Sequence, residues 1–116
     1  MSPSAPAVDE GVLRALLDDM GGDVEVIKEL IQSYLEEAPR LLAEAKAALV
    51  GNDAPTFQRA VHTLKSTSAT FGAMPLAEAS KALEQAAKGG ALPAPAEFAQ
   101  IEAMAAAVRV ELVKRL

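Results

Sequence analysis

The apolar residues of this chain recur with helical spacing along almost its whole length, and this periodicity constrains the fold more than any other feature. Between residues 9 and 116, each apolar stripe has the three- and four-residue spacing that defines one face of a helix. No segment shows the apolar–polar alternation of a half-buried strand. The chain is therefore predicted to be all-α.

Aspartate, glycine and proline residues divide this pattern into separate helices. Asp9, Asp23 and Asp53 each stand just before an apolar stripe, where an aspartate side chain can cap a helix. Pro39 lies inside the longest stripe, which continues in phase beyond it, so a bend is expected there and not an end. Gly72 is expected to end the third helix in a left-handed conformation. The five predicted helices cover residues 10–20, 24–50, 54–71, 75–88 and 96–116.

Four amphipathic helices joined by short loops predict an antiparallel four-helix bundle, with the short N-terminal helix closing one end. Alanine accounts for 25 of the 116 residues, so small side chains and close helix contacts are expected in the core. Residues 9–116 would form this domain, after a disordered tail over residues 1–8. In the last helix the expected core face consists of Phe98, Ile101, Ala105, Val108, Leu112 and Leu116.

The composition excludes several classes of site. The chain has no cysteine, which rules out disulfides, thiol nucleophiles and thiolate metal sites. It has a single histidine, His62, whereas a di-iron bundle needs two. The net charge of −5 and the isoelectric point near 4.8 argue against nucleic acid as a partner.

The sequence shows neither a membrane span nor a secretory signal. No apolar run approaches the ~18 residues that cross a bilayer, and the N-terminus lacks the basic and apolar regions of a signal peptide. A cytoplasmic protein without membrane contact is expected. Residues 1–51 carry ten acids and four bases, against six and seven in residues 52–116. A solvated acidic surface is the simpler interpretation, and an acidic partner for the second half is the more specific one.

The histidine is expected to point outward from the third helix. On a helical wheel, His62 falls roughly 150° from the centre of the apolar stripe of that helix. Cations beside it would repel a metal ion but stabilise a phosphoryl group. The stripe consists of Phe57, Ala60, Val61, Leu64, Ser68 and Phe71, and the neighbours of the histidine are Pro55, Gln58, Arg59, Lys65, Ser66 and Ala69.

The segment from His62 to Ala73 resembles the signature of histidine phosphotransfer (HPt) domains of bacterial phosphorelays. That signature reads His-x-x-Lys-Gly, followed by small residues and a further glycine, which here is Gly72. The likeness extends over most of the chain and includes the long second helix with a proline in mid-course. One position departs from it: Ser66 stands where the family usually has glycine.

The resemblance implies a role for each residue around the histidine. His62 would accept the phosphoryl group, and Lys65 would offset its charge, with Gln58 and Ser66 as hydrogen-bond donors. Glu84, 22 residues after the histidine, would hold the ring through Nδ1 and leave Nε2 free. Gln85 is the adjacent possibility for this role. The alternative for Glu84 is an exposed residue paired with Lys81 or Lys88.

The implied partners are response-regulator receiver domains, a hybrid sensor histidine kinase, or both. The phosphoryl group would pass reversibly between His62 and a receiver aspartate, and the receiver would supply the Mg²⁺, so no cofactor or metal of the chain's own is expected. The chain would be a monomeric carrier and not a kinase, since no Walker motif is present. The residues expected to dock the receiver are Arg59, Ala69, Met20, Lys81 and Lys88, with Val12 and Phe71 as further candidates.

Three other interpretations remain open on the sequence. The chain could be a helical adaptor in which His62 is incidental, or an inhibitor that binds a receiver or kinase without accepting phosphate. It could also be a haem or metal bundle with His62 and one of Met20, Met74 or Met104 as ligands. The outward direction of the histidine opposes this last interpretation.

Overall fold

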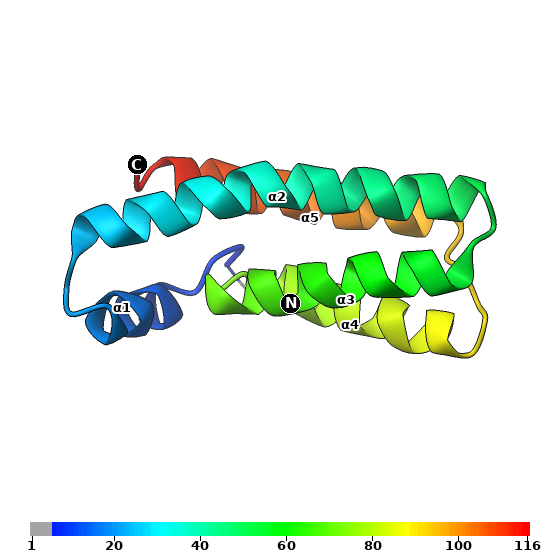
Figure 1. Ribbon diagram of the computed structural model, residues 1–116, viewed down its shortest axis with the longest axis horizontal. Coiled ribbons are helices and arrows are strands. Elements are labelled where there is room, and N and C mark those ends of the chain that lie inside the picture. Colours follow the sequence, from blue (N-terminus) through cyan, green and yellow to red (C-terminus); the bar gives the residue numbers. More distant parts are fainter. Residues whose placement is uncertain (1–5) are drawn as a thin grey trace, which may run out of the picture.

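The computed structural model describes residues 6–116, and its helices follow the predicted pattern closely (Figure 1). The all-α prediction is confirmed. The fifth helix ends earlier than expected, so Leu116 lies beyond it and is 46% exposed instead of belonging to the core face. The helices are α1 (Glu10–Asp19), α2 (Val24–Val50), α3 (Ala54–Thr70), α4 (Met74–Lys88) and α5 (Pro95–Val113).

The four long helices form an antiparallel bundle in two layers. Figure 1 shows α2 beside α5 in one layer and α3 beside α4 in the other, with successive helices running in opposite directions. The short α1 crosses the end of the bundle where α3 turns into α4. Pro39 does not end α2, because the helix continues to Val50 as the sequence predicts. The predicted bundle with a short closing helix is thus confirmed.

The core contains the stripe expected on α3. Phe57, Val61 and Leu64 are at most 1% exposed, and the remaining members of the stripe are buried as well. One buried polar pair joins the layers: Tyr34 Oη and Ser68 Oγ are 2.8 Å apart. Burial raises the pKa of the Tyr34 hydroxyl. The apolar side of α3 is buried in the core, so the opposite side of this helix faces solvent.

The folded domain begins before Asp9. The disordered tail expected over residues 1–8 therefore does not extend to Val8. Residues 1–5 lie outside the described residues, but Val8 is only 4% exposed and packs in the core. The Asp9 amide donates a hydrogen bond of 2.8 Å to the Gly72 carbonyl. In the part of the chain that the structure describes, no helix is both long and apolar enough to cross a membrane.

Gly72 has two functions in this packing. Its φ of +78° ends α3 in the left-handed conformation that the sequence predicts. In addition, a Cβ at this position would lie 2.8 Å from the carbonyl oxygen of Asp9 and 3.1 Å from Cβ of Val12. The backbone of α1 therefore rests directly on this glycine, which the sequence alone does not reveal.

We expect Gly72→Ala to destabilise the domain more than Gly90→Ala. Both residues have a positive φ, +78° and +87°, so both substitutions carry the left-handed cost of about 1–2 kcal/mol. Nothing lies within 4 Å of a Cβ at Gly90, whereas the clash at Gly72 should add about 1–3 kcal/mol. Chemical denaturation measures both losses, and equal losses would contradict the close contact between α1 and Gly72.

Candidate functional site

His62 lies on the solvent side of α3, as its position on the wheel predicts. Its side chain is 58% exposed, while the neighbouring Val61 and Leu64 are buried. The Asp53 carboxylate caps the start of α3 by accepting a hydrogen bond from the Thr56 amide, and the buried stripe of α3 sets the direction in which His62 points. An imidazole in this position is held by the rigid helix and is open to a partner from outside.

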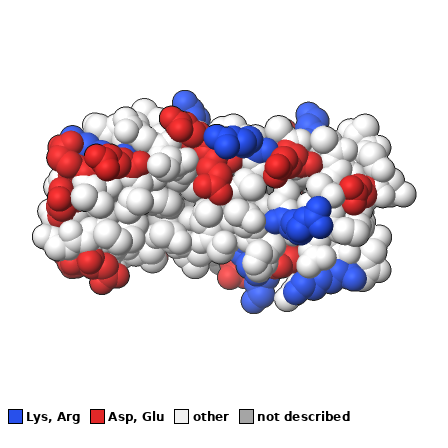
Figure 2. Space-filling view, in the orientation of Figure 1, with Lys and Arg blue, Asp and Glu red and all other residues white. Residues whose placement is uncertain are grey.

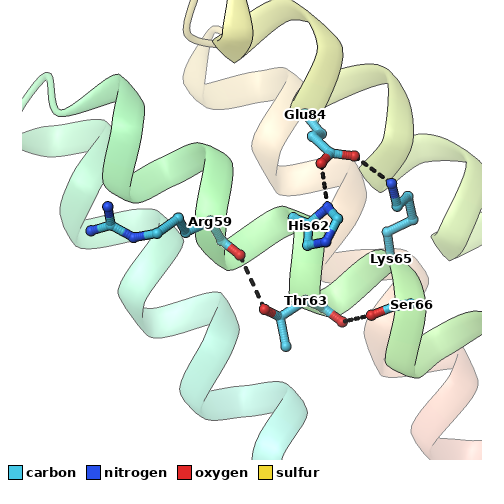
Figure 3. Close-up of polar contacts among 6 residues, drawn as sticks. All are labelled: Arg59, His62, Thr63, Lys65, Ser66 and Glu84. Carbon is cyan, nitrogen blue, oxygen red and sulfur yellow. Dashed lines mark hydrogen bonds and ion pairs between the residues drawn. The ribbon is translucent and has the colours of Figure 1, made fainter.

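The Glu84 carboxylate on α4 joins two side chains of α3, those of His62 and Lys65. Glu84 Oε2 contacts His62 Nδ1, and Glu84 Oε1 accepts a hydrogen bond of 2.5 Å from Lys65 Nζ (Figure 3). The Glu84 side chain is only 4% exposed. It pairs with neither Lys81 nor Lys88, and Gln85, the adjacent possibility, is exposed. The structure therefore places Glu84 beside the histidine and not on the open surface.

The charge state of Glu84 follows from its two partners. The hydrogen bond from Lys65 is the largest effect and holds the pKa of Glu84 below its ordinary value of 4.5, with a smaller contribution from His62. Burial works in the opposite direction but does not prevail. An ionised carboxylate only accepts hydrogen bonds, so Nδ1 of His62 carries the proton that points to it. In the neutral imidazole, the other ring nitrogen, Nε2, then has a free lone pair.

A shallow, open depression surrounds the histidine. It is lined by Gln58, Arg59, His62, Thr63, Glu84 and Lys88. Gln58 is half-buried within it. Arg59 borders this depression, but its side chain points toward α2 and away from His62 in Figure 3. There its guanidinium donates to the Thr56 hydroxyl over 3.3 Å.

The hydroxyl groups of this helix surface are bonded to the helix itself. Ser66 Oγ donates to the Thr63 carbonyl over 3.2 Å, and Thr63 Oγ1 donates to the Arg59 carbonyl over 3.2 Å. Thr63 borders the depression, but no sequence pattern distinguishes it from other helical threonines. Ser66 is exposed one turn after His62, and its hydroxyl would have to rotate to meet an incoming group.

The expected docking residues are spread over three elements. Met20 is 39% exposed and follows α1. Ala69 is half-buried on α3, and Lys81 and Lys88 are exposed on α4. Of the two further candidates, Phe71 is 6% exposed and belongs to the core, and Val12 is half-buried.

Charge is unevenly distributed over the molecule. Acidic side chains predominate at the end formed by α1 and the start of α2, on the left of Figure 2, and elsewhere Lys and Arg are interspersed with them. Within residues 6–116, no three His, Asp or Glu side chains come together as metal ligands. Among the cationic residues, Lys65 shares the Glu84 carboxylate with the histidine, and Lys88 lines the same depression.

We expect the Glu84 carboxylate to stabilise the fold at neutral pH but not in acid. Folding lowers the pKa of Glu84. Its contribution to the free energy of unfolding is therefore complete above the ordinary pKa of 4.5 and is lost as the pH falls through the folded-state pKa. The difference in unfolding free energy between wild type and Glu84→Gln should therefore be constant from pH 7 to about pH 5.5 and shrink at lower pH.

The matched control is Glu78→Gln, which removes an exposed carboxylate of the same helix. This variant should unfold like the wild type across the same pH range. A difference for Glu84→Gln that stays constant to pH 3 would show that the carboxylate gains nothing from Lys65 and His62.

Comparisons with known proteins agree with this geometry. The family model described as the Hpt domain matches residues 29–111. A crystal structure of histidine-containing phosphotransfer protein B (HptB) from Pseudomonas aeruginosa PAO1 shares 32% sequence identity, covering 96% of this chain and 95% of that one, with a TM-score of 0.85. No curated protein matches the sequence. The chain belongs to the Hpt domain family, the histidine phosphotransfer proteins of phosphorelays.

Proposed function

We propose that His62 is the phosphoacceptor of this phosphotransfer protein and that Nε2 is the attacking atom. The observation that carries the proposal is the contact of Nδ1 with a buried carboxylate on a ring that is itself 58% exposed. That contact orients the imidazole and keeps the proton on Nδ1. The nitrogen that remains nucleophilic is then Nε2.

The transfer step needs few groups from this chain. The Nε2 lone pair attacks the phosphorus of an aspartyl phosphate on a receiver domain, and the bond from phosphorus to the aspartate oxygen breaks. The aspartate leaves as a carboxylate with the electron pair of that bond. The proton on Nδ1 stays in place, and the positive charge that develops on the ring is stabilised by Glu84. The reverse reaction passes the group to another receiver aspartate.

Lys65 is proposed to offset the charge of the phosphoryl group. Its ammonium group donates a hydrogen bond to the Glu84 carboxylate, which also contacts the His62 ring, and Lys65 follows His62 by one turn of α3. Gln58 borders the same depression and can donate from its amide. Ser66 is proposed as a third donor, after rotation of the hydroxyl that now bonds to Thr63.

The proposed partners are receiver domains, free or within a hybrid sensor kinase. Receiver docking is assigned to the exposed Met20, Lys81 and Lys88, together with Ala69 and the outer part of Arg59. The Mg²⁺ of the reaction is proposed to come with the receiver, because lysine ammonium groups next to His62 repel a cation. In this proposal the chain carries the group in the cytoplasm and has no kinase activity.

We expect His62→Gln to abolish phosphotransfer. The wild type incubated with a radiolabelled phospho-receiver from the same organism should take up label that is labile in acid and stable in alkali. His62→Gln should take up none, because it has no nucleophilic nitrogen, while its circular dichroism should match the wild type. Equal label on both proteins would exclude His62 as the acceptor, and a wild type that binds the receiver without label would favour an adaptor or inhibitor.

We expect Lys65→Met to slow transfer by about 10- to 100-fold, because the substitution removes a charged hydrogen bond worth about 1.5–3 kcal/mol. Lys88→Met is the matched control, because Lys88 lines the depression without contacting Glu84. Rapid-quench measurement at saturating receiver separates transfer from binding. Equal effects of the two substitutions at saturation would contradict a specific role for Lys65.

A further inference from the structure

The last helix, α5, is apolar on its outward side as well as on its core side. Its core side consists of Phe98, Ile101, Val108 and Leu112. On the outside, Val110 is 58% exposed and Val113 is 46% exposed. Helices that are apolar all round are normally covered on both sides. The outer surface of α5 therefore has the composition of a contact surface.

An apolar groove runs beside this surface, between α5 and α2. Its lining includes Leu35, Ala38, Pro39 and Leu42 from α2 and Ala105 and Ala106 from α5. Since Pro39 has no amide hydrogen, it cannot donate to the carbonyl of Leu35 one turn earlier. Groove and exposed helix surface meet at Ala106, so one partner helix can cover both.

We propose, in place of the monomer expected from the sequence, that this surface binds a second copy of the chain, with the two α5 helices packed antiparallel. Five of the exposed apolar residues of α5 are spaced alternately by four and three residues, the repeat of a helix that pairs with another helix. In an antiparallel pair centred between Ala103 and Ala106, each Ala103 lies opposite Ala106 of the second copy, and each Ala99 opposite Val110. The residues concerned are Ala99, Ala103, Ala106, Val110 and Val113.

The charges of α5 identify a second copy as the occupant. Among the described residues, the charged side chains that line the groove are Glu102 and Arg109, which are two helical turns apart. Glu102 also forms an ion pair of 3.9 Å with Lys46 of its own chain, in which both side chains remain partly exposed. In the antiparallel register, Glu102 of each copy lies close to Arg109 of the other, so the same pair of opposite charges forms twice. The small side chains between them permit close approach of the two helices. Such self-complementarity is the property of a two-fold symmetric interface.

This interface leaves the proposed phosphoacceptor open. His62 and Glu84 belong to the layer of α3 and α4, whereas the groove belongs to the layer of α2 and α5 (Figure 1). The dimer would therefore present two separate histidines to receivers. It stands independently of the role proposed for His62.

Sedimentation equilibrium tests the dimer with a charge exchange. We expect the wild type to dimerise with a dissociation constant below about 1 mM. Glu102→Arg and Arg109→Glu should each weaken dimerisation at least about tenfold, since each places like charges together twice, and the double variant should restore it. Glu78→Arg, an exposed charge reversal on α4, is the control and should leave dimerisation unchanged.

Two results would overturn the proposal. One is a wild type that remains monomeric at about 1 mM. The other is a dimer that neither single variant weakens, or that the double variant fails to restore. Circular dichroism of all variants establishes that the exposed substitutions leave the fold intact, and Val110→Lys gives a second means of blocking the surface without changing either charged residue.

Discussion

The close antiparallel packing of α3 on α4 is the contact on which the site depends. The buried residues of α4 are mostly small, with Ala77, Ser80 and Ala87 beside Leu76 and Glu84. Small side chains let two helix backbones approach closely, and a glutamate on one helix can then reach a ring on the other. A larger residue in this interface would separate the helices and move Glu84 away from His62.

The same carboxylate performs two tasks because it has two oxygens facing different donors. One holds the histidine through Nδ1, and the other binds the Lys65 ammonium. The lysine in turn keeps the carboxylate ionised against the effect of burial, by lowering its pKa. Ring orientation is therefore controlled by one buried group, while the ring itself stays in solvent where a partner can reach it.

The core of the bundle combines large apolar side chains with many small ones. Alanine, serine and valine fill much of the interior. One glycine, Gly72, packs directly against the backbone at the start of α1. The outer surface of α5 is also rich in small apolar residues. The side of α5 that is not used by the core is also apolar, and its exposed valines lie beside the groove against α2.

Much of this molecule could be predicted from local patterns. Helix periodicity and aspartate caps predicted the five helices, because both depend on neighbouring residues only. The wheel of α3 predicted the outward direction of His62 for the same reason. The resemblance of the motif to the family supplied Glu84 as the ring partner, at a separation that no local pattern contains.

The tertiary structure decided what depends on packing between helices. It showed that Val8 belongs to the core, that Arg59 points toward α2 and that Lys65 donates a hydrogen bond to Glu84. A long side chain can extend in several directions from the same helical position, and the choice depends on groups from other helices. The sequence by itself determined which side of α3 presents His62 to solvent. Only the contact with α4 decided which neighbours reach it, because that contact fixes distances between residues far apart in the chain.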